Sequence, residues 1–444
     1  MKKFAFTFFL ICFYVNSFGA WKQSLSYYAN KCDSFNIGAS VKGIFFDTGV
    51  YDSGDIYNQT IINNYNILVT GNEMKFVSLE PKQGVFDFSK SDMFVNYALK
   101  YKMKVRGHTL CWHNQLPSFI NAGLTNDIPN GTFTRASLMA ILKNHITTVV
   151  RRYKGKVHQW DVVNEAIDVT TPSGLRENIW QQIIGNDYID SAFVWANRAD
   201  PKAKLYLNDY SVEFNGTTKA NALFNYIRGM KMRNIPITGA GLQCHFVVNN
   251  INLTAFDSNL KRYAINGLEA IVTELDIKIL DTDYAANANL QLTNQANDYK
   301  NLVQVCLNNS NCRTFVTWGF TDAISWIPGQ TNYTYGHALV FDESYKPKPA
   351  YTAMLNELAT ISGLTTVGET PKNDPLIIQY TNGKMLVRSA IKITRCRLFD
   401  LSGRNLYSSI NGENQIEISI RNNSVYVLKI QLEDGRMINR KIAF

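Results

Sequence analysis

The chain has 444 residues, of which 45% are hydrophobic and 18% are charged, and this composition excludes intrinsic disorder, collagen-like repeats and a disulfide-dominated scaffold. The net charge of +9 is uneven, because residues 373–444 hold 11 basic and 6 acidic side chains while residues 21–372 are close to neutral. A basic tail on a near-neutral body argues against nucleic-acid binding, for which the charge would lie on a recognition surface.

The first 20 residues have the pattern of a secretory signal peptide. Lys2 and Lys3 are followed by an apolar run from Phe4 to Val15 and then by small residues that end at Ala20. The apolar run is shorter than the roughly 20 residues that a transmembrane helix requires. We therefore expect residues 1–20 to be removed and the mature protein to be exported without spanning a membrane.

Export to an oxidising compartment changes how the cysteines are interpreted. Cys306 and Cys312 flank the polar turn Leu-Asn-Asn-Ser-Asn, a spacing that a disulfide can close, so we predict a Cys306–Cys312 disulfide. Cys32, Cys111, Cys244 and Cys396 are scattered singly and are expected to be packed thiols. No Cys-x-x-Cys or Cys/His metal spacing occurs, and His145, His158 and His337 are interpreted as structural or surface histidines. No metal or other cofactor is expected.

Short β-branched runs alternate with long amphipathic stretches between residues 21 and 364. This alternation, repeated eight times, predicts a (β/α)8 TIM barrel of the α/β class, with helices that include 135–153, 217–232 and 289–307. The eight predicted strands are 37–41, 67–70, 104–108, 157–163, 203–207, 239–245, 270–275 and 314–318.

Polar and aromatic side chains follow these strands at the points where they end. Glu165 follows the fourth predicted strand, and Glu274 lies near the end of the seventh, so the two should face each other across the mouth of the barrel. Paired carboxylates across a cleft are the groups that hydrolyse glycosides. The alternative is that they are two unrelated glutamates at the rim, each paired with a basic residue.

Several long motifs, in order, resemble those of glycoside hydrolase family 10 endo-β-1,4-xylanases over roughly residues 25–360. They are Asn72-Glu73-Met74-Lys75, Arg106–His113, Trp160–Glu165, Asn208-Asp209-Tyr210, Gly241–His245, Thr273–Asp276, Trp318–Asp322 with Ser325-Trp326, and Lys348–Tyr351.

The resemblance implies hydrolysis of xylan with retention of configuration, in which Glu165 is the acid/base and Glu274 is the nucleophile. It implies that the enzyme needs no cofactor, and we expect a monomer. A barrel with β-glucanase activity and an inactive carbohydrate-binding barrel are the alternatives. The substrate-binding residues implied by the resemblance are Asn72, Lys75, His108, Trp112, Gln115, Asn164, Tyr210, Gln243, His245, Asp276, Trp318 and Trp326.

Two positions depart from the family pattern. Gly71 stands where the family commonly has a glutamate, which implies weaker binding of the sugar one step beyond the reacting unit on the glycone side. Loss of one charged hydrogen bond would cost roughly 1.5–3 kcal/mol there. Phe76, where tryptophan often follows the lysine, is a milder change.

The pattern of the last part of the chain predicts a second, smaller domain there. After a linker at residues 365–373, residues 374–444 contain apolar alternation with a period of two, separated by Gly and Asn turns, which predicts a small all-β, sandwich-like domain. Leu398–Arg404, Val425–Ile430 and Lys441-Ile442 resemble the C-terminal sorting domain of the Bacteroidetes type IX secretion system. The resemblance implies the type IX secretion machinery as a partner and a secreted or cell-surface location. A carbohydrate-binding β-sandwich is the alternative.

Overall fold

The structure is a computed structural model, and the predicted signal peptide (1–20) and linker (365–373) lie outside the residues that it describes. It describes residues 23–33, 35–42, 56–126, 128–362, 376–381, 384–400, 404–410, 412–419 and 425–443.

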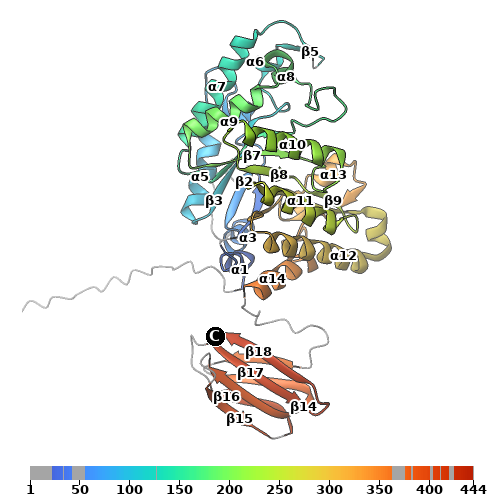
Figure 1. Cartoon of the computed structure of the whole chain (residues 1–444). Helices are drawn as coiled ribbons and strands as arrows, with labels where there is room; N and C mark the ends of the chain where they lie inside the picture. Colours follow the sequence, from blue (N-terminus) through green and yellow to red (C-terminus); the bar gives the residue numbers. More distant parts are fainter. Residues whose placement is uncertain are drawn as a thin grey trace, which may run out of the picture.

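Eight parallel strands close into a barrel, which confirms the predicted (β/α)8 fold (Figure 1). The ring closes because β11 pairs with both β1 and β10. All eight predicted strands are present, two of them with long C-terminal extensions. The barrel strands are β1 (Asn36–Val41), β2 (Ile67–Thr70), β3 (Lys104–Cys111), β6 (Gln159–Asn164), β7 (Lys204–Asp209), β8 (Gly239–Leu242), β10 (Glu269–Leu280) and β11 (Thr314–Thr317).

Helices surround the barrel, and some of the longer ones begin where a side chain caps the first turn. Thr134 and Ser137 form a capping box at the start of α7, and Thr217 caps α10. The helices are α1 (Leu25–Ala29), α3 (Ile56–Asn64), α4 (Phe76–Leu79), α5 (Ser89–Lys100), α6 (Ser118–Asn121), α7 (Arg135–Arg152), α8 (Ile179–Ile184), α9 (Tyr188–Ala199), α10 (Thr218–Met232), α11 (Leu253–Ile265), α12 (Asp281–Asn308), α13 (Ile327–Gln330) and α14 (Pro349–Ile361), with the 3-10 turn η1 (Asp322–Ile324).

Short strands add detail to the ends of the barrel. They are β4 (Leu124–Thr125), β5 (Ile128–Pro129), β9 (His245–Val247) and β12 (Tyr335–Gly336). The predicted strand 239–245 is divided between β8 and β9, because Cys244 has a left-handed backbone with φ of 64°. The division matters for function, since β9 pairs with the extension of β10 at the mouth of the barrel.

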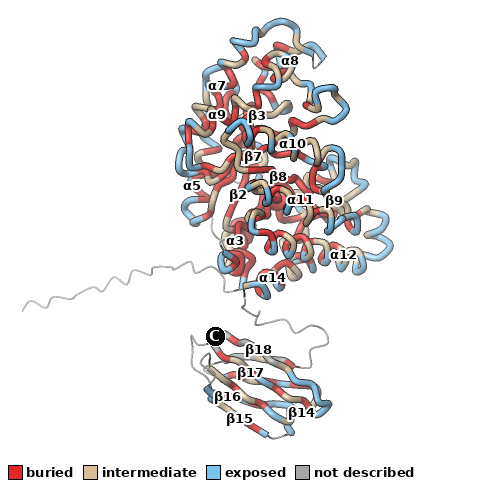
Figure 2. Tube along the Cα trace, viewed as in Figure 1, coloured by how far each residue is buried: buried red, intermediate tan, exposed pale blue. Residues whose placement is uncertain are grey.

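The barrel strands are buried along nearly their whole length (Figure 2), as expected for parallel strands covered on both faces. Packing is close where β3 meets β6: a Cβ atom built on Gly107 would lie 2.1 Å from the ring of Trp160. Trp160 is fully buried and belongs to the core of the barrel domain. Among the described residues, no helix has the length and hydropathy needed to span a membrane.

The six cysteines that the structure describes are all buried and free, so the predicted Cys306–Cys312 disulfide is not present. The turn between α12 and β11 does bring the two thiols close enough to interact. Burial raises the pKa of the Cys306 thiol, which disfavours the thiolate that must attack to form a disulfide.

The C-terminal segment forms an antiparallel sheet with its own apolar core, which includes Met385, Leu398 and Leu428. The long β14 pairs with β13 and β16 along its first half and with β15 and β17 along its second half. The prediction of an all-β segment is thus confirmed, while sandwich-like packing stays a prediction. The strands are β13 (Leu376–Thr381), β14 (Lys384–Asp400), β15 (Asn405–Ser409), β16 (Glu413–Ser419), β17 (Val425–Leu432) and β18 (Met437–Ala443).

Candidate active site

A cavity of about 860 Å³ opens at the carboxyl ends of the barrel strands, where TIM barrels carry their active sites. Its volume is within the usual range for a ligand pocket, about 300–1,000 Å³. Glu165 and Glu274 both line it. The other lining residues are Lys75, His108, Trp112, Asn114, Asn164, Tyr210, Ser211, Glu213, Phe214, Thr217, Gln243, His245, Phe246, Val247, Asn250, Trp318, Trp326 and Gln330.

Glu165 directly follows β6 and has a left-handed backbone with φ of 57°, which is uncommon for a residue with a side chain. Both carboxylate oxygens have donors: Trp112 Nε1 lies 2.9 Å from Oε2, and Gln243 Nε2 lies 3.1 Å from Oε1. His113 Nε2 is 3.9 Å from Oε2. The side chain is 16% exposed, so Glu165 is held in a fixed position but open to a ligand in the cavity.

Glu274 lies inside β10, and its side chain is only 7% exposed. Asn208 Nδ2 donates to its Oε1 at 2.7 Å, and His245 Nε2 lies 3.7 Å from its Oε2. Burial by itself would raise the pKa of Glu274, but hydrogen bonds from His245 and Asn208 and the positive charge of His245 outweigh it, so the pKa is lowered. Glu274 is therefore kept ionised in a buried position.

His245 links Glu274 to a second carboxylate. Its Nδ1 lies 2.9 Å from Asp276 Oδ2, which also accepts a hydrogen bond from Trp326 Nε1 at 2.9 Å. Burial opposes a charge on the imidazole, but Asp276 and Glu274 together raise the pKa of His245 to about 10. At neutral pH His245 is thus a cation between two carboxylates, and Asp276 fixes its ring.

A row of side-chain amides connects the two glutamates of the cavity. Asn208 Nδ2 donates both to Glu274 and to Asn164 Oδ1, and Gln243 Nε2 lies 3.4 Å from the same Asn164 oxygen while donating to Glu165. Thr273 Oγ1 donates to Asn208 Oδ1 at 2.7 Å, which fixes the orientation of that amide. The two carboxylates are therefore held in one hydrogen-bonded network.

One wall of the site is formed after β2 and β3. The Lys75 ammonium lies 3.1 Å from Asn72 Oδ1, donates to Gln115 Oε1, and is 4.9 Å from the centre of the Trp112 ring. Burial lowers the pKa of Lys75, and the carboxylates Glu274 and Glu165 act against this lowering. A largely buried ammonium beside amide oxygens is well suited to donate hydrogen bonds to a polar ligand.

His108, from β3, lines the cavity on the same side as Lys75. Its Nδ1 lies 2.9 Å from Asp161 Oδ2, and Arg106 forms an ion pair with the other oxygen of that carboxylate inside the barrel. The ring of Trp318 meets the His108 ring edge-on, with 5.2 Å between centroids. Asp161 thereby fixes the orientation of the His108 ring.

Another side of the cavity is built around Tyr210, a residue that is 36% exposed. Arg176 donates to the Tyr210 hydroxyl at 2.8 Å and to the backbone oxygen of Glu165 at 2.9 Å. The Lys219 ammonium lies 3.3 Å from the centre of the Tyr210 ring and forms a 2.7 Å ion pair with Asp209. Burial raises the pKa of Asp209 to about 6.

The site therefore holds two carboxylates in contrasting environments. Glu274 is buried and stabilised as an anion by donors, whereas Glu165 is more exposed and has an indole and an amide on its oxygens. Pairs of titratable groups in such different surroundings commonly divide the roles of acid and nucleophile between them.

The comparisons with known proteins agree with this geometry. The family model for glycosyl hydrolase family 10 matches residues 34–357. The chain belongs to glycosyl hydrolase family 10. It is 37% identical over 340 residues to endo-1,4-beta-xylanase B of Thermotoga neapolitana, which covers 77% of this chain and 93% of that protein.

Solved structures of family 10 enzymes resemble the barrel at a similar level. Native xylanase 10B of Thermotoga maritima has a TM-score of 0.70 at 36% identity, covering 77% of this chain and 99% of that one. Xylanase 10B of Thermotoga petrophila RKU-1, solved in complex with xylobiose, also has a TM-score of 0.70 at 36% identity, covering 76% and 98%. Residues 364–444 match a domain family of unknown function, DUF8694.

Most predicted site residues of the family 10 domain line the cavity. Asn72, Gln115 and Asp276 are the exceptions: the first two surround the Lys75 ammonium, and Asp276 lies behind His245. All three thus contact residues that line the cavity. The predicted residues on the cavity wall are Lys75, His108, Trp112, Asn164, Glu165, Tyr210, Gln243, His245, Glu274, Trp318 and Trp326.

Several residues of the site were not predicted as site residues. Asp161 lies within the Trp160–Glu165 motif, but as one polar residue inside an apolar strand it was not assigned to the site. Arg176 and Glu213 lie in loops, where no periodicity marks the side chains that turn inward. Asn208 does carry a signal, since it ends β7 beside Asp209 in a motif typical of the family.

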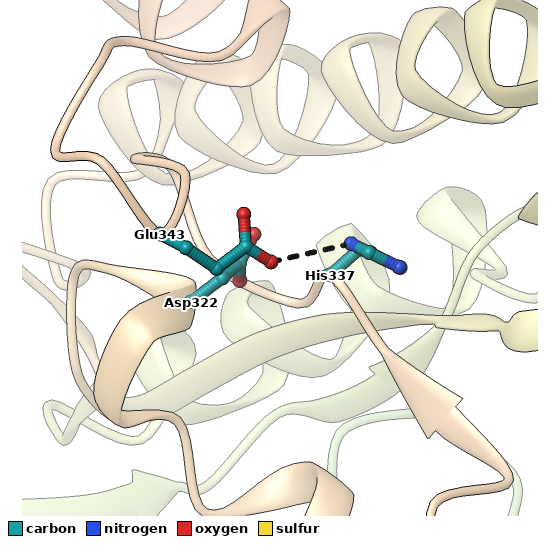
Figure 3. Close-up of side chains that lie close together, drawn as sticks. All are labelled: Asp322, His337 and Glu343. Carbon is teal, nitrogen blue, oxygen red and sulfur yellow. Dashed lines mark ion pairs between the residues drawn. The ribbon is translucent and has the colours of Figure 1, made fainter.

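A second polar cluster of the family 10 domain consists of Asp322, His337 and Glu343 (Figure 3). One ligand atom each from Asp322, His337 and Glu343 lies within 4.8 Å of the others, a spacing that could hold a cation. The Lys348 ammonium, however, lies 2.8 Å from Asp322 Oδ2, and the Leu339 N–H donates to Oδ1. Lys348 therefore already supplies the positive charge, and we assign no metal to this cluster.

Proposed function

We propose that this protein is an endo-β-1,4-xylanase that cleaves internal bonds of xylan with retention of configuration. The observation that carries the proposal is the amide network that joins Glu165 to the ionised Glu274 at the mouth of a family 10 barrel. The similarity to endo-1,4-beta-xylanase B of Thermotoga neapolitana over 93% of its length supports the choice of substrate.

In the proposed mechanism Glu274 attacks the anomeric carbon while Glu165 donates its proton to the leaving oxygen. The resulting glycosyl-enzyme ester is then hydrolysed by water, from which Glu165 takes a proton. The His245 cation and the Asn208 amide keep Glu274 ionised for the attack. Trp112 and Gln243 hold Glu165 where the leaving oxygen would lie.

The surrounding residues would bind the sugar chain. Asn164 would contact the 2-hydroxyl of the reacting sugar, a hydrogen bond that strengthens as the ring flattens in the transition state. Trp318 and Trp326 would form walls around that sugar, and Tyr210 would stack on the sugar of the leaving side. Gln115 and Trp326 would disfavour the hydroxymethyl group that distinguishes glucose from xylose.

Product analysis on glucuronoarabinoxylan tests this function, with proton NMR to follow the anomer that is released first. The wild type should release β-configured oligosaccharides, and Glu274→Ala should release almost none. Release of the α-anomer first would contradict the retaining mechanism. Cleavage of a β-glucan with xylan untouched would contradict the choice of substrate, and no cleavage of either would favour a binding protein.

We also propose that residues 374–444 direct export through the type IX secretion machinery, with the enzyme released or attached at the cell surface of a Bacteroidetes-type bacterium. The all-β fold of this segment and its motifs at Leu398–Arg404 and Val425–Ile430 support the proposal. Expression of the whole chain in a Bacteroidetes host, with and without an intact type IX system, tests it. Equal amounts outside the cell in both strains would contradict it.

A further inference from the structure

Glu213 is a buried carboxylate in the cavity wall to which the proposed mechanism gives no part. It lies in the loop between β7 and α10 and is 4% exposed. Its Oε1 accepts a hydrogen bond from the backbone N–H of Cys244 at 3.0 Å. The contact is long-range in the sequence, and it connects two loops of the barrel mouth.

Cys244 occupies a sharp turn between two residues of the site. Its φ of 64° is left-handed, an unfavourable conformation for a residue with a side chain. On one side of it Gln243 donates to Glu165, and on the other side His245 faces Glu274 and Asp276. The conformation of Cys244 thus sets the directions of the side chains that serve both glutamates.

Glu213 is itself held firmly from behind. Asn259 of α11 donates through Nδ2 to the backbone oxygens of both Val212 and Glu213, each at 2.9 Å. Arg262 in turn donates to Asn259 Oδ1 at 2.7 Å. A rigid helix therefore fixes the loop that presents the Glu213 carboxylate to the turn at Cys244.

We propose that Glu213 is a positioning residue that holds the left-handed turn at Cys244 and, through it, aligns Gln243 with Glu165 and His245 with Glu274. The inference rests on the proposed function, because it concerns the geometry of that reaction. This role requires a side chain long enough to place an acceptor oxygen at the Cys244 N–H. It does not require the negative charge of Glu213.

Two substitutions separate the effect of side-chain length from the effect of charge. Glu213→Gln keeps an acceptor oxygen at the same length and removes the charge, whereas Glu213→Asp keeps the charge and shortens the side chain by one methylene. A displacement of about 1 Å at a catalytic group can cost about 100-fold in rate. We expect Glu213→Asp to lower kcat by about 10- to 100-fold with little change in KM, and Glu213→Gln to stay close to the wild type.

Asp200, the residue that caps the C-terminus of α9 before β7, offers a matched control. It is also a buried carboxylate, and it accepts the backbone N–H of Gly155 at 2.8 Å without contact to the site. Asp200→Leu should lower the Tm and leave the kcat of the folded enzyme unchanged. Glu213→Leu, if it folds, should lose at least as much kcat as Glu213→Asp.

An activity of Glu213→Asp equal to or above that of Glu213→Gln would overturn the proposal, because charge and not reach would then matter. A loss of kcat in Asp200→Leu as large as that in Glu213→Asp would also overturn it, since general destabilisation would explain both. The proposed function is tested separately by the wild type and Glu274→Ala. If the wild type cleaves a β-glucan instead of xylan, the same contrast is measured on that polymer.

Discussion

At the scale of single residues, the site depends on donors that stabilise a buried anion. Asn208 donates to Glu274 and Asn164 at once, while Thr273 fixes its amide. Asn208→Ala would remove a charge-assisted hydrogen bond worth roughly 1.5–3 kcal/mol, so kcat/KM should fall about 10- to 100-fold. Steady-state kinetics on xylo-oligosaccharides measure this, with Asn208→Asp as a second variant that adds a charge beside Glu274. Unchanged kinetics in Asn208→Ala would mean that His245 alone holds the nucleophile.

The protonation of His245 can be followed directly. Its pKa of about 10 lies above the roughly 6.5 of a free histidine, so its proton stabilises the folded state below about pH 6.5, and this stabilisation is lost as the pH rises towards 10. In Asp276→Asn the pKa of His245 should drop, because the Asp276 carboxylate is the group that raises this pKa most. NMR titration of the imidazole in both proteins measures the difference. A wild-type imidazole that is already neutral at pH 8 would contradict the cation assigned here.

At the scale of elements, the position of Asn208 depends on close contact between neighbouring strands. A Cβ atom built on Gly241 of β8 would lie 2.3 Å from Asn208 Oδ1 on β7. Gly241→Ala should therefore push Asn208 away from Glu274 and lower both kcat and stability, the latter by about 1–3 kcal/mol as in other overpacked cores. Activity assays and urea unfolding test this. Gly329→Ala, where an added Cβ meets nothing within 4 Å, is the control and should change neither.

The barrel strands could be predicted from the sequence because each is a short apolar run that ends in polar residues. The bend at Cys244 could not, since residues 239–245 have the composition of one strand and the division into β8 and β9 depends on a backbone angle. Hydrogen bonds between residues far apart in the sequence could not be predicted either. Glu213 accepts from Cys244, and Arg176 donates to Tyr210, only because the folded barrel brings these residues together. The motifs predicted which residues surround the cavity. Which of them line it, and which only hold a lining residue in place, depends on packing in the folded protein.

At the scale of the whole molecule, the described residues of the barrel and those of the C-terminal sheet have separate apolar cores. The residues that line the active-site cavity all lie between Lys75 and Gln330. The barrel closes through β1, β10 and β11 without any strand of the C-terminal sheet. The family 10 domain should therefore fold and act without the C-terminal segment.

A protein that ends at Ser362 tests this independence. It should keep the kcat and KM of the full-length enzyme on soluble xylo-oligosaccharides, because no residue of the cavity is removed. On insoluble xylan the two proteins should also be equally active if the segment serves export, whereas a carbohydrate-binding segment would make the shortened protein slower on insoluble xylan alone. Pull-down of each protein with insoluble xylan gives the same distinction without catalysis, and Glu274→Ala in both backgrounds prevents digestion during the assay. Stronger retention of the full-length protein would therefore count against a role in sorting alone.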